Sequence, residues 1–304
     1  MVDVKSVILI GGTGFVGRKI ANLLVNRGYS VTIPTRSLSY ARPLLVLPLV
    51  KAVELNIHDP RQLEHLVTSE KNCVAVINLV GILHDAPGIP YGNNFAKNHV
   101  ELTKNIIHAM SVSKVKRLLH MSALGADSKG PSMYQRSKGD AENLVKQSDL
   151  NWTIFRPSVI FGKDDNLINL FKTLIKLAPV MPLAGYHAKF QPVSVHNVAE
   201  VFVKALELPK TIRQSYDLGG PQVYSLADLV RFSGKMIGKK PLLIPLPHML
   251  GYLQAFLIEK LPGPTLMSRD NVASMLVDNV LTGSGNVIED VFGLTAEPLE
   301  SLLY

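Results

Sequence analysis

Cysteine is nearly absent from this sequence of 304 residues, in which Cys73 is the only one. A single thiol can form neither an intrachain disulfide nor a cysteine-based metal cluster, and this usage suits a reducing compartment. Long apolar runs are missing too. The longest uncharged stretch, Pro241–Ile258, is broken by Pro245 and Pro247, whereas a membrane-spanning helix needs about 20 mostly apolar residues. We therefore expect no transmembrane segment, and no secretory signal, because the first apolar run, Val7–Ile10, leads into glycines.

Acidic residues are also scarce, with 24 Asp and Glu against 32 Lys and Arg, so the chain carries a formal charge of +8. This excess suits anionic partners such as nucleotide phosphates or an acidic lipid surface. The basic residues are scattered and do not interleave with aromatic ones, so we expect no nucleic-acid partner. The nine histidines lack the paired spacing of metal ligands, and no G-x-S-x-G sequence marks a hydrolase nucleophile. We expect neither a metal site nor acyl transfer.

What the sequence does contain is an alternation of short β-rich runs and helical patterns through its first half. Six strands are predicted, over Ser6–Ile10, Tyr29–Pro34, Ala52–Leu55, Val74–Leu79, Arg117–Met121 and Trp152–Phe155. Helices are predicted between them, including Asn94–Ser113 and Ser132–Ser148. Strands that alternate with helices predict the α/β class, with a doubly wound parallel sheet whose ligand site lies at the carboxyl ends of the strands.

A glycine-rich loop follows the first predicted strand and opens the first predicted helix. Its G-x-x-G-x-x-G spacing in this context predicts a dinucleotide site, and a glycine-rich turn without a ligand is the alternative. Gly11 permits the tight turn, Gly14 lets backbone N–H groups approach the pyrophosphate, and Gly17 lets the helix pack on the strand. The helix N-terminus adds partial positive charge. The expected contacts of the cofactor in this loop are Gly11, Thr13, Gly14, Phe15, Val16, Gly17 and Arg18.

The alternation of strands and helices stops after Gly162, which predicts a second lobe. We assign residues 1–162 and about 190–220 to an NAD(P)-binding Rossmann domain, and about 163–189 and 221–304 to a small, mostly helical lobe for substrate or partner. Phe190–Val195 is expected to return to the sheet, followed by a helix and a short strand, Ser215–Leu218. Beyond Pro221 only helical patterns and proline-rich connections are visible.

The end of the second predicted strand indicates which dinucleotide is preferred. About 20 residues beyond the loop, an Asp or Glu would hold the two ribose hydroxyls of NAD. This sequence has Arg36 instead. A guanidinium can pair with the 2′-phosphate of NADP in forked geometry, and Arg18 can support the same charge. We therefore expect NADP(H) to be preferred and NAD(H) to be the second choice; the alternative is that Arg36 only solvates a loop.

Tyr134 and Lys138 stand four residues apart on a predicted helix and so project from one face. A tyrosine has an ordinary pKa near 10, which a neighbouring ammonium can lower toward neutrality. The same lysine can reach ribose hydroxyls. A YxxxK pair arises often by chance, but this helix follows the fifth strand, beside the nicotinamide end of the site. Tyr134 and Lys138 are therefore the candidate catalytic residues, and both are expected to contact the cofactor.

Together these residues resemble the short-chain dehydrogenase/reductase superfamily, in its extended and atypical branches with an epimerase/dehydratase-type domain. The resemblance is closest to the branch that includes the nucleotide-binding accessory subunit of respiratory complex I and its bacterial relatives, and it spans nearly the whole chain. Besides the glycine loop and the Tyr134/Lys138 pair, it rests on Val76–Leu83, His120–Ala126, Phe155–Gly162, Gln191–Val195 and Asp278–Val280.

The resemblance implies roles for further positions. Val80 and Gly81 match residues that pack on the adenosine side, and Pro157 and Val159 match backbone beside the nicotinamide carboxamide. Asn56 stands where many relatives place an Asp that receives the adenine amino group. The implied cofactor contacts outside the glycine loop are Arg36, Asn56, Ile57, Val80, Gly81, Ser122, Tyr134, Lys138, Pro157 and Val159.

One position departs from the superfamily pattern. Catalytically competent relatives carry a Ser or Thr at the end of the fifth strand, where this sequence has Ala123 with Ser122 one residue earlier. Adjacent strand residues face opposite sides, so Ser122 cannot simply replace the missing hydroxyl. Asn98 matches the supporting Asn of the superfamily. The catalytic set is thus incomplete, which weakens the expectation of turnover but not of cofactor binding.

Two functions are consistent with the sequence. One is an NADP(H)-dependent oxidoreductase that passes a hydride to or from a carbonyl, alcohol or quinone-like compound; the other is a non-catalytic accessory or assembly subunit of a complex I-like assembly. The expected location is the cytoplasm, with membrane contact at most peripheral, at the inner membrane. Pro241–Ile258 is open to three interpretations: ordinary core, an apolar wall for a hydrophobic ligand, or a surface that docks on a membrane or protein.

Overall fold

The computed structural model describes residues 4–178, 180–260, 262, 265–283 and 285–303, and every candidate site residue lies in these ranges. Residues 1–3, 179, 261, 263–264, 284 and 304 of the expected domains lie outside them. Within the described residues, no helix is long and apolar enough to cross a membrane.

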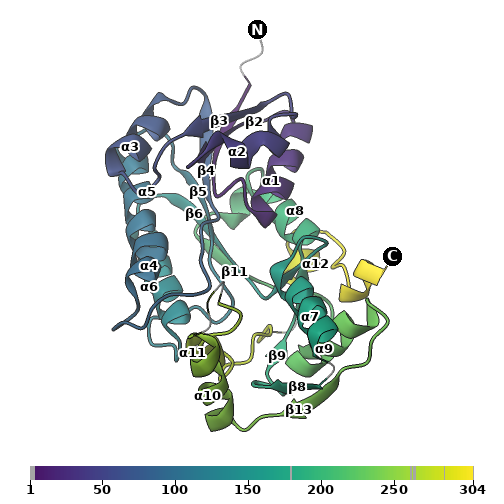
Figure 1. The fold of residues 1–304 in the computed structure, drawn as a ribbon. Helices are drawn as coiled ribbons and strands as arrows, with labels where there is room; N and C mark the ends of the chain where they lie inside the picture. The colour runs from purple at the N-terminus through teal and green to yellow at the C-terminus, as the bar shows by residue number, and fades with distance from the viewer. Residues whose placement is uncertain (1–3, 179, 261, 263–264, 284, 304) are drawn as a thin grey trace.

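Seven parallel strands form the central sheet in the order β11-β6-β5-β4-β1-β2-β3 (Figure 1). The strands are β1 (Ser6–Ile10), β2 (Ser30–Thr35), β3 (Val50–Glu54), β4 (Cys73–Asn78), β5 (Arg117–Met121), β6 (Asn151–Pro157) and β11 (Gln214–Leu218). The strand order reverses between β1 and β4, which is where doubly wound sheets bind ligands. All six strands predicted in the first half are confirmed, and the predicted strand at Ser215–Leu218 forms the edge of the sheet.

Helices cover both faces of the sheet, with α1 and α8 on one side and α3, α5 and α6 on the other (Figure 1). The helices of this domain are α1 (Phe15–Asn26), α2 (Leu38–Ala41), α3 (Pro60–Ser69), α4 (Asn93–Phe95), α5 (Leu102–Ser111), α6 (Met133–Gln147) and α8 (Val195–Ala205), with a π-helical segment at Ala96–Glu101 and 3-10 turns at Arg42–Leu44 and Pro209–Thr211. Strand β1 explains this layering. Val7 and Leu9 join the core under α1, whereas Ile8 and Ile10 join the core under α3 and α5.

The rest of the chain builds a smaller layered unit around its own apolar core. It contains β7 (Ile160–Phe161), α7 (Asn166–Leu177), β8 (Val180–Leu183), β9 (Lys189–Phe190), β10 (Val193–Ser194), β12 (Tyr224–Ser225), α9 (Leu226–Lys235), β13 (Leu242–Pro245), α10 (His248–Ile258), α11 (Arg269–Ser274) and a 3-10 turn at Leu299–Leu303. Helix α12 (Val287–Asp290) comes from the same part of the chain, but its Ile288 packs into the core of the Rossmann domain. The core of the smaller unit includes Phe171 and Ile175 of α7 and Leu229 and Val230 of α9.

Two expectations for this part of the chain were wrong. Phe190–Val195 does not rejoin the central sheet: it forms β9 and β10, which pair with β12 and β7, because Pro192 between them has no N–H for a continuous ladder. The region beyond Pro221 is not only helical, since β13 pairs in parallel with β8. Near the C-terminus, Ile288 and Phe292 pack into the core of the Rossmann domain.

Candidate dinucleotide site

The glycine loop turns sharply from β1 into α1. Gly11 has a φ of 84°, a conformation that favours glycine. A Cβ on Gly17 would come within 2.4 Å of the Gly11 carbonyl oxygen and 2.6 Å of the Gly12 Cα. A side chain there is excluded, so the first turn of α1 lies directly over the end of β1. This close packing is the geometry that the loop was expected to provide.

The N-terminus of α1 is open to an anion. Gly14 is its N-cap and is exposed, so no side chain caps the first N–H groups, and the first turn contains no acidic residue. Arg18 donates from Nε to the Thr13 carbonyl oxygen over 3.1 Å, which keeps a guanidinium beside the loop. Free N–H groups, the helix dipole and a nearby cation together fit a pyrophosphate.

Two apolar residues of the loop hold it against the rest of the domain. Val16 is buried under the sheet, and Phe15 reaches across to the end of β7, where a Cβ on Gly162 would come within 2.8 Å of the Phe15 ring. The position of Phe15 thus depends on a glycine almost 150 residues further along the chain. Val16 and Phe15 shape the loop from behind and from the side.

Arg36 follows β2 directly and is exposed at the same edge of the sheet. A carboxylate shares this corner: Glu54 is the register partner of Thr35, and its Oε2 accepts a hydrogen bond from the Leu38 N–H over 3.1 Å. Sequence reasoning missed Glu54, because strand pairing brings it beside β2. The corner therefore holds both a guanidinium and a carboxylate near the expected ribose position.

Asn56 and Ile57 lie just beyond β3, also at the carboxyl edge. The side-chain oxygen of Asn56 accepts a hydrogen bond from the His58 N–H over 3.1 Å, and its backbone N–H donates to Gln62 Oε1 over 2.9 Å. Ile57 packs at the margin of the core beneath α3. Asn56 is exposed, so its amide remains accessible to a ligand although one oxygen contact is already made within the protein.

Lys138 is buried, with 3% of its surface exposed, and its Nζ donates to the Met121 carbonyl oxygen at the end of β5 over 2.8 Å. A Cβ on Gly81 would lie 3.5 Å from the same Nζ, which places the loop after β4 against the ammonium. Burial lowers the pKa of Lys138 to about 8, although nearby Glu142 acts in the opposite direction. The folded chain therefore maintains a poorly solvated cation where β4, β5 and α6 meet.

Tyr134 lies one turn earlier on α6, with its ring edge-on to His99 at 5.7 Å and to Phe95 at 6.1 Å. Burial raises the pKa of Tyr134 to about 12. The expected lowering by Lys138 is absent in this state, because the ammonium is bound to the Met121 carbonyl and the phenol is poorly solvated. The phenol therefore keeps its proton at neutral pH.

His99 links three parts of this region, and sequence reasoning missed it. Its Nε2 accepts from the Ile82 N–H over 3.0 Å, so the ring proton is on Nδ1, which lies 2.8 Å from Ser137 Oγ. Ser137 in turn donates to the Tyr134 carbonyl oxygen. Burial lowers the pKa of His99 to about 2, and Lys138 adds to this effect, so the imidazole is neutral.

Asn98, the expected supporting residue, does not occupy this place. Its Nδ2 donates to the Asn94 carbonyl oxygen over 2.9 Å near the surface. The reason is the π-helical segment Ala96–Glu101, whose wider turn changes which side chains face inward. His99 packs against Tyr134 instead.

Two buried polar atoms at the end of β5 have no hydrogen-bond partner among the described residues: Ser122 Oγ and His120 Nε2. Burial lowers the pKa of His120 to about 3, so this ring is neutral as well. Ala123 is buried beside them. The Ser122 hydroxyl is among the causes that lower the pKa of Glu142, so it lies near that carboxylate.

Pro157 and Val159 are fixed by a polar network centred on Asn279. Ser158 Oγ donates to Asn279 Oδ1 over 2.6 Å, and Asn279 Nδ2 donates to the Leu124 carbonyl oxygen over 3.0 Å. The backbone N–H of Val193 also bonds the Val159 carbonyl oxygen. A segment near residue 279 thus joins the ends of β5 and β6.

A second clamp acts on α6 itself. Asp270 of α11 accepts from the backbone N–H groups of Met133 (2.6 Å) and Tyr134 (3.1 Å), the first residues of the helix. Burial raises the pKa of Asp270, and these hydrogen bonds oppose the rise. The helix that carries Tyr134 and Lys138 is therefore capped by a residue that comes 136 positions later.

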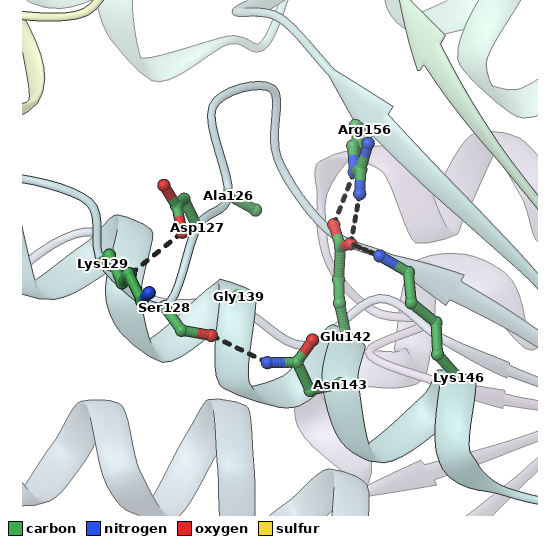
Figure 2. Close-up of a pocket in the computed structure, with 9 residues that line it drawn as sticks. All are labelled: Ala126, Asp127, Ser128, Lys129, Gly139, Glu142, Asn143, Lys146 and Arg156. Carbon is green, nitrogen blue, oxygen red and sulfur yellow. Dashed lines mark hydrogen bonds and ion pairs between the residues drawn. The ribbon is translucent and has the colours of Figure 1, made fainter.

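A polar surface pocket of about 450 Å³ lies on another side of α6 (Figure 2). Arg156 and Lys146 converge there on the buried Glu142, with Arg156 Nε 2.7 Å from Oε1 and Lys146 Nζ 2.8 Å from Oε2. Burial favours a higher pKa for Glu142, but hydrogen bonds from Arg156 and Lys146 lower it to about 2. The lining residues include none of the predicted site residues, so we treat this pocket as separate.

A comparison with known protein families agrees with a dinucleotide site built from the glycine loop, the strand edge and the buried lysine. Residues 11–209 match the family described as NAD(P)H-binding, which is more than half of the chain. The chain belongs to this NAD(P)H-binding family. It binds a dinucleotide, and its resemblance to the atypical short-chain dehydrogenase/reductases is confirmed.

Two proteins that are similar in sequence and one solved structure that is similar in fold illustrate these relations. The chain is 28% identical to mitochondrial NADH dehydrogenase (ubiquinone) 1 alpha subcomplex subunit 9 of Arabidopsis thaliana, over 93% of this chain and 72% of that one. It is 24% identical to the photosystem II assembly factor Ycf39 of Guillardia theta, over 98% and 97%. A nucleoside-diphosphate-sugar epimerase from Staphylococcus aureus shares the fold, with a TM-score of 0.75, 16% identity and 98% and 99% coverage. The predicted relation to the complex I subunit is thereby confirmed.

Proposed function

We propose that this protein is an NADP(H)-dependent oxidoreductase of the atypical short-chain type. The observation that carries the proposal is the pair on α6: a protonated Tyr134 and a desolvated Lys138, with the ammonium against the Gly81 loop and the end of β5. A buried lysine that contacts no carboxylate lowers the stability of the fold, so folding alone gives no reason to keep it. Ionisable groups with strongly shifted pKa values cluster at functional sites.

Each residue would have a defined task. Bound NADPH would supply the hydride. Tyr134 holds its proton at neutral pH and would donate it to the oxygen of a carbonyl compound as that compound is reduced to the alcohol. Lys138 would bind ribose hydroxyls. His99 would act as a positioning residue, because its two ring nitrogens connect the loop after β4 to the backbone of Tyr134 through Ser137.

The activity is tested by following NADPH oxidation by the purified protein against a panel of carbonyls and quinones. A general acid contributes about a hundredfold or more, so Tyr134→Phe should reduce kcat by at least that factor. Tyr40→Phe is the matched control, because Tyr40 is 60% exposed and lies on α2. If no acceptor speeds oxidation, or if Tyr134→Phe leaves an observed rate unchanged, the catalytic proposal fails.

We also propose that NADP(H) is preferred over NAD(H). Arg36 is exposed and offers a forked cation for the 2′-phosphate, whereas the carboxylate of Glu54 already accepts a hydrogen bond from the Leu38 N–H. Calorimetry should give at least a tenfold preference for NADP(H), which Arg36→Ala should remove and exposed Arg42→Ala should not. Equal affinity of the unaltered protein for both dinucleotides would refute the role of Arg36.

A second candidate function is a nucleotide-binding accessory or assembly subunit of a respiratory assembly. It is favoured by Ala123, which leaves the catalytic set one hydroxyl short, and by the similarity to a complex I subunit and an assembly factor. In that role the bound dinucleotide would stabilise the fold and exchange slowly. Co-purification of stoichiometric dinucleotide together with respiratory subunits, without turnover, would select this function. In either role we propose a cytoplasmic protein whose contact with the inner membrane is at most peripheral.

A further inference from the structure

Helix α10 exposes large apolar side chains around most of its circumference. Among its eleven residues only Gly251 and Ala255 are buried. Six large apolar residues of the helix are exposed, by 38–83% of their surface: Met249, Leu250, Tyr252, Leu253, Phe256 and Leu257. Monomeric proteins rarely present so many neighbouring apolar side chains to water without a partner. The interpretation of α10 as ordinary core is therefore wrong.

The exposure follows from how α10 is attached. Gly251 and Ala255 are one turn apart and form the side that faces the protein, where a Cβ on Gly251 would come within 2.7 Å of Ala184 Cβ. Gln254 Nε2 also donates to the Pro182 carbonyl oxygen over 2.9 Å. The helix is held by its smallest side chains, so its largest ones point outward in the folded state.

A neighbouring segment extends this surface. Strand β13 runs into α10 through Pro247, and its residues Leu242 and Ile244 are 62% and 46% exposed. Leu242 is the register partner of Val180 on β8, which is 45% exposed. Figure 1 shows α10, β13 and β8 together at the lower end of the molecule, away from α2 and β3. The apolar surface therefore lies at one end of the protein.

Cations border the apolar residues. Residues 241–258 contain no charged side chain; Lys239 and Lys240 precede them, and Glu259 and Lys260 follow. Glu259 forms an ion pair with Arg269, whose Nε lies 2.8 Å from Glu259 Oε2, so the lysines supply the net positive charge. Lys260 Nζ lies 5.5 Å from the centre of the Phe256 ring, and the Arg269 guanidinium lies 5.0 Å from the same ring. The lysines beside these exposed apolar and aromatic side chains favour contact with an acidic lipid surface.

We propose that α10 is a membrane-docking helix that places its exposed apolar residues among the headgroups and upper acyl chains of an acidic bilayer. At 1.5 Å per residue its eleven residues extend about 16 Å, about half the thickness of the hydrocarbon core, so it would lie in the interface rather than span it. The formal charge of +8 favours an anionic bilayer over a neutral one. The proposal needs no nucleotide turnover and stands independently of the proposed reaction.

Vesicle co-sedimentation tests this surface. The full-length protein should bind vesicles of 70% phosphatidylcholine and 30% phosphatidylglycerol at low salt. Its affinity for vesicles of phosphatidylcholine alone should be at least tenfold lower. The triple variant Met249→Ser, Leu253→Ser, Leu257→Ser removes the exposed ridge and should lose binding at least tenfold. Val46→Ser is the matched control, because Val46 is 80% exposed but lies near α2. This variant should bind the vesicles as the unaltered protein does. Circular dichroism should show both variants folded.

The orientation on the membrane gives a second measurement. Brominated acyl chains should quench the tryptophan fluorescence of the Tyr252→Trp variant on α10, but not that of the Tyr40→Trp variant on α2. The native Trp152 is buried and supplies a constant background fluorescence. Absence of binding to the acidic vesicles, full binding by the triple variant, or quenching at Tyr40→Trp alone would overturn the proposal. A dimer of the unaltered protein that the triple variant converts to monomer, without vesicle binding, would assign the surface to a second copy instead.

Discussion

Replacing Lys138 by methionine should stabilise the protein while removing its function. Methionine has a similar length and no charge, so it fills the same space without the desolvated ammonium. Burial lowers the pKa of Lys138 from 10.5 to about 8. At about 1.4 kcal/mol for each pH unit, carrying the charge in the folded state costs about 3 kcal/mol at pH 7.

Part of this gain is offset. The variant loses the hydrogen bond from Nζ to the Met121 carbonyl oxygen, which contributes about 1 kcal/mol, and it leaves that oxygen without this donor. The net expectation is a free energy of unfolding about 1 to 2 kcal/mol higher than that of the unaltered protein at pH 7. Dinucleotide affinity should fall, because the ribose loses its cation.

The pH dependence identifies the cause. Between about pH 8 and 10.5 the unfolded chain retains the lysine proton that the folded chain has released, so the unaltered protein gains stability as the pH rises. The methionine variant lacks this gain, and the difference between the two should close by about pH 9.5. Urea unfolding at pH 7 and 9.5 measures both values, with exposed Lys104→Met as the control. A variant that is less stable at pH 7, or a difference that does not change with pH, would refute the reasoning.

Two further substitutions test the packing around the site. Gly17→Ala should reduce the free energy of unfolding by about 1–3 kcal/mol and weaken dinucleotide binding, because its Cβ meets the Gly11 carbonyl, whereas Gly283→Ala, in open space, should do neither. Glu142→Gln should destabilise by about 3 kcal/mol at pH 7, because Arg156 loses its carboxylate partner. The folded-state pKa of Glu142 is depressed to about 2, so this difference should shrink as the pH falls from 4.5 toward 2 in a urea unfolding series. A difference that is constant over this range would contradict the assigned ion pair.

Local patterns in the sequence predicted the central sheet and the phosphate loop well. Val7–Ile10 is apolar at every position, as a strand buried on both faces requires, and the glycines that follow fix the turn. The placement of Tyr134 and Lys138 on one helix was also predictable, because it depends on the pattern of that helix alone. These features need only contacts between residues close in the sequence.

Features that depend on distant contacts or irregular backbone were not predictable. His99 rather than Asn98 faces the site, because the π-helical turn changes which side chains point toward the sheet. The spacing of apolar residues in the sequence does not predict such a turn. Asp270 and Asn279 reach the site only through the fold of the small lobe, across more than 100 residues. The raised pKa of Tyr134 likewise results from burial, which the spacing of two residues does not encode.

The placement of Ile288 and Phe292 in the first core has a consequence for synthesis on the ribosome. Phe292 packs against Phe155 with their ring centres 6.1 Å apart, beside helices formed from the beginning of the chain. The nascent protein therefore exposes an incomplete apolar face over β6 and β11 until these last residues have been translated. An open apolar face of this kind favours aggregation, so a premature stop codon after residue 220 would release a Rossmann domain whose core is permanently incomplete.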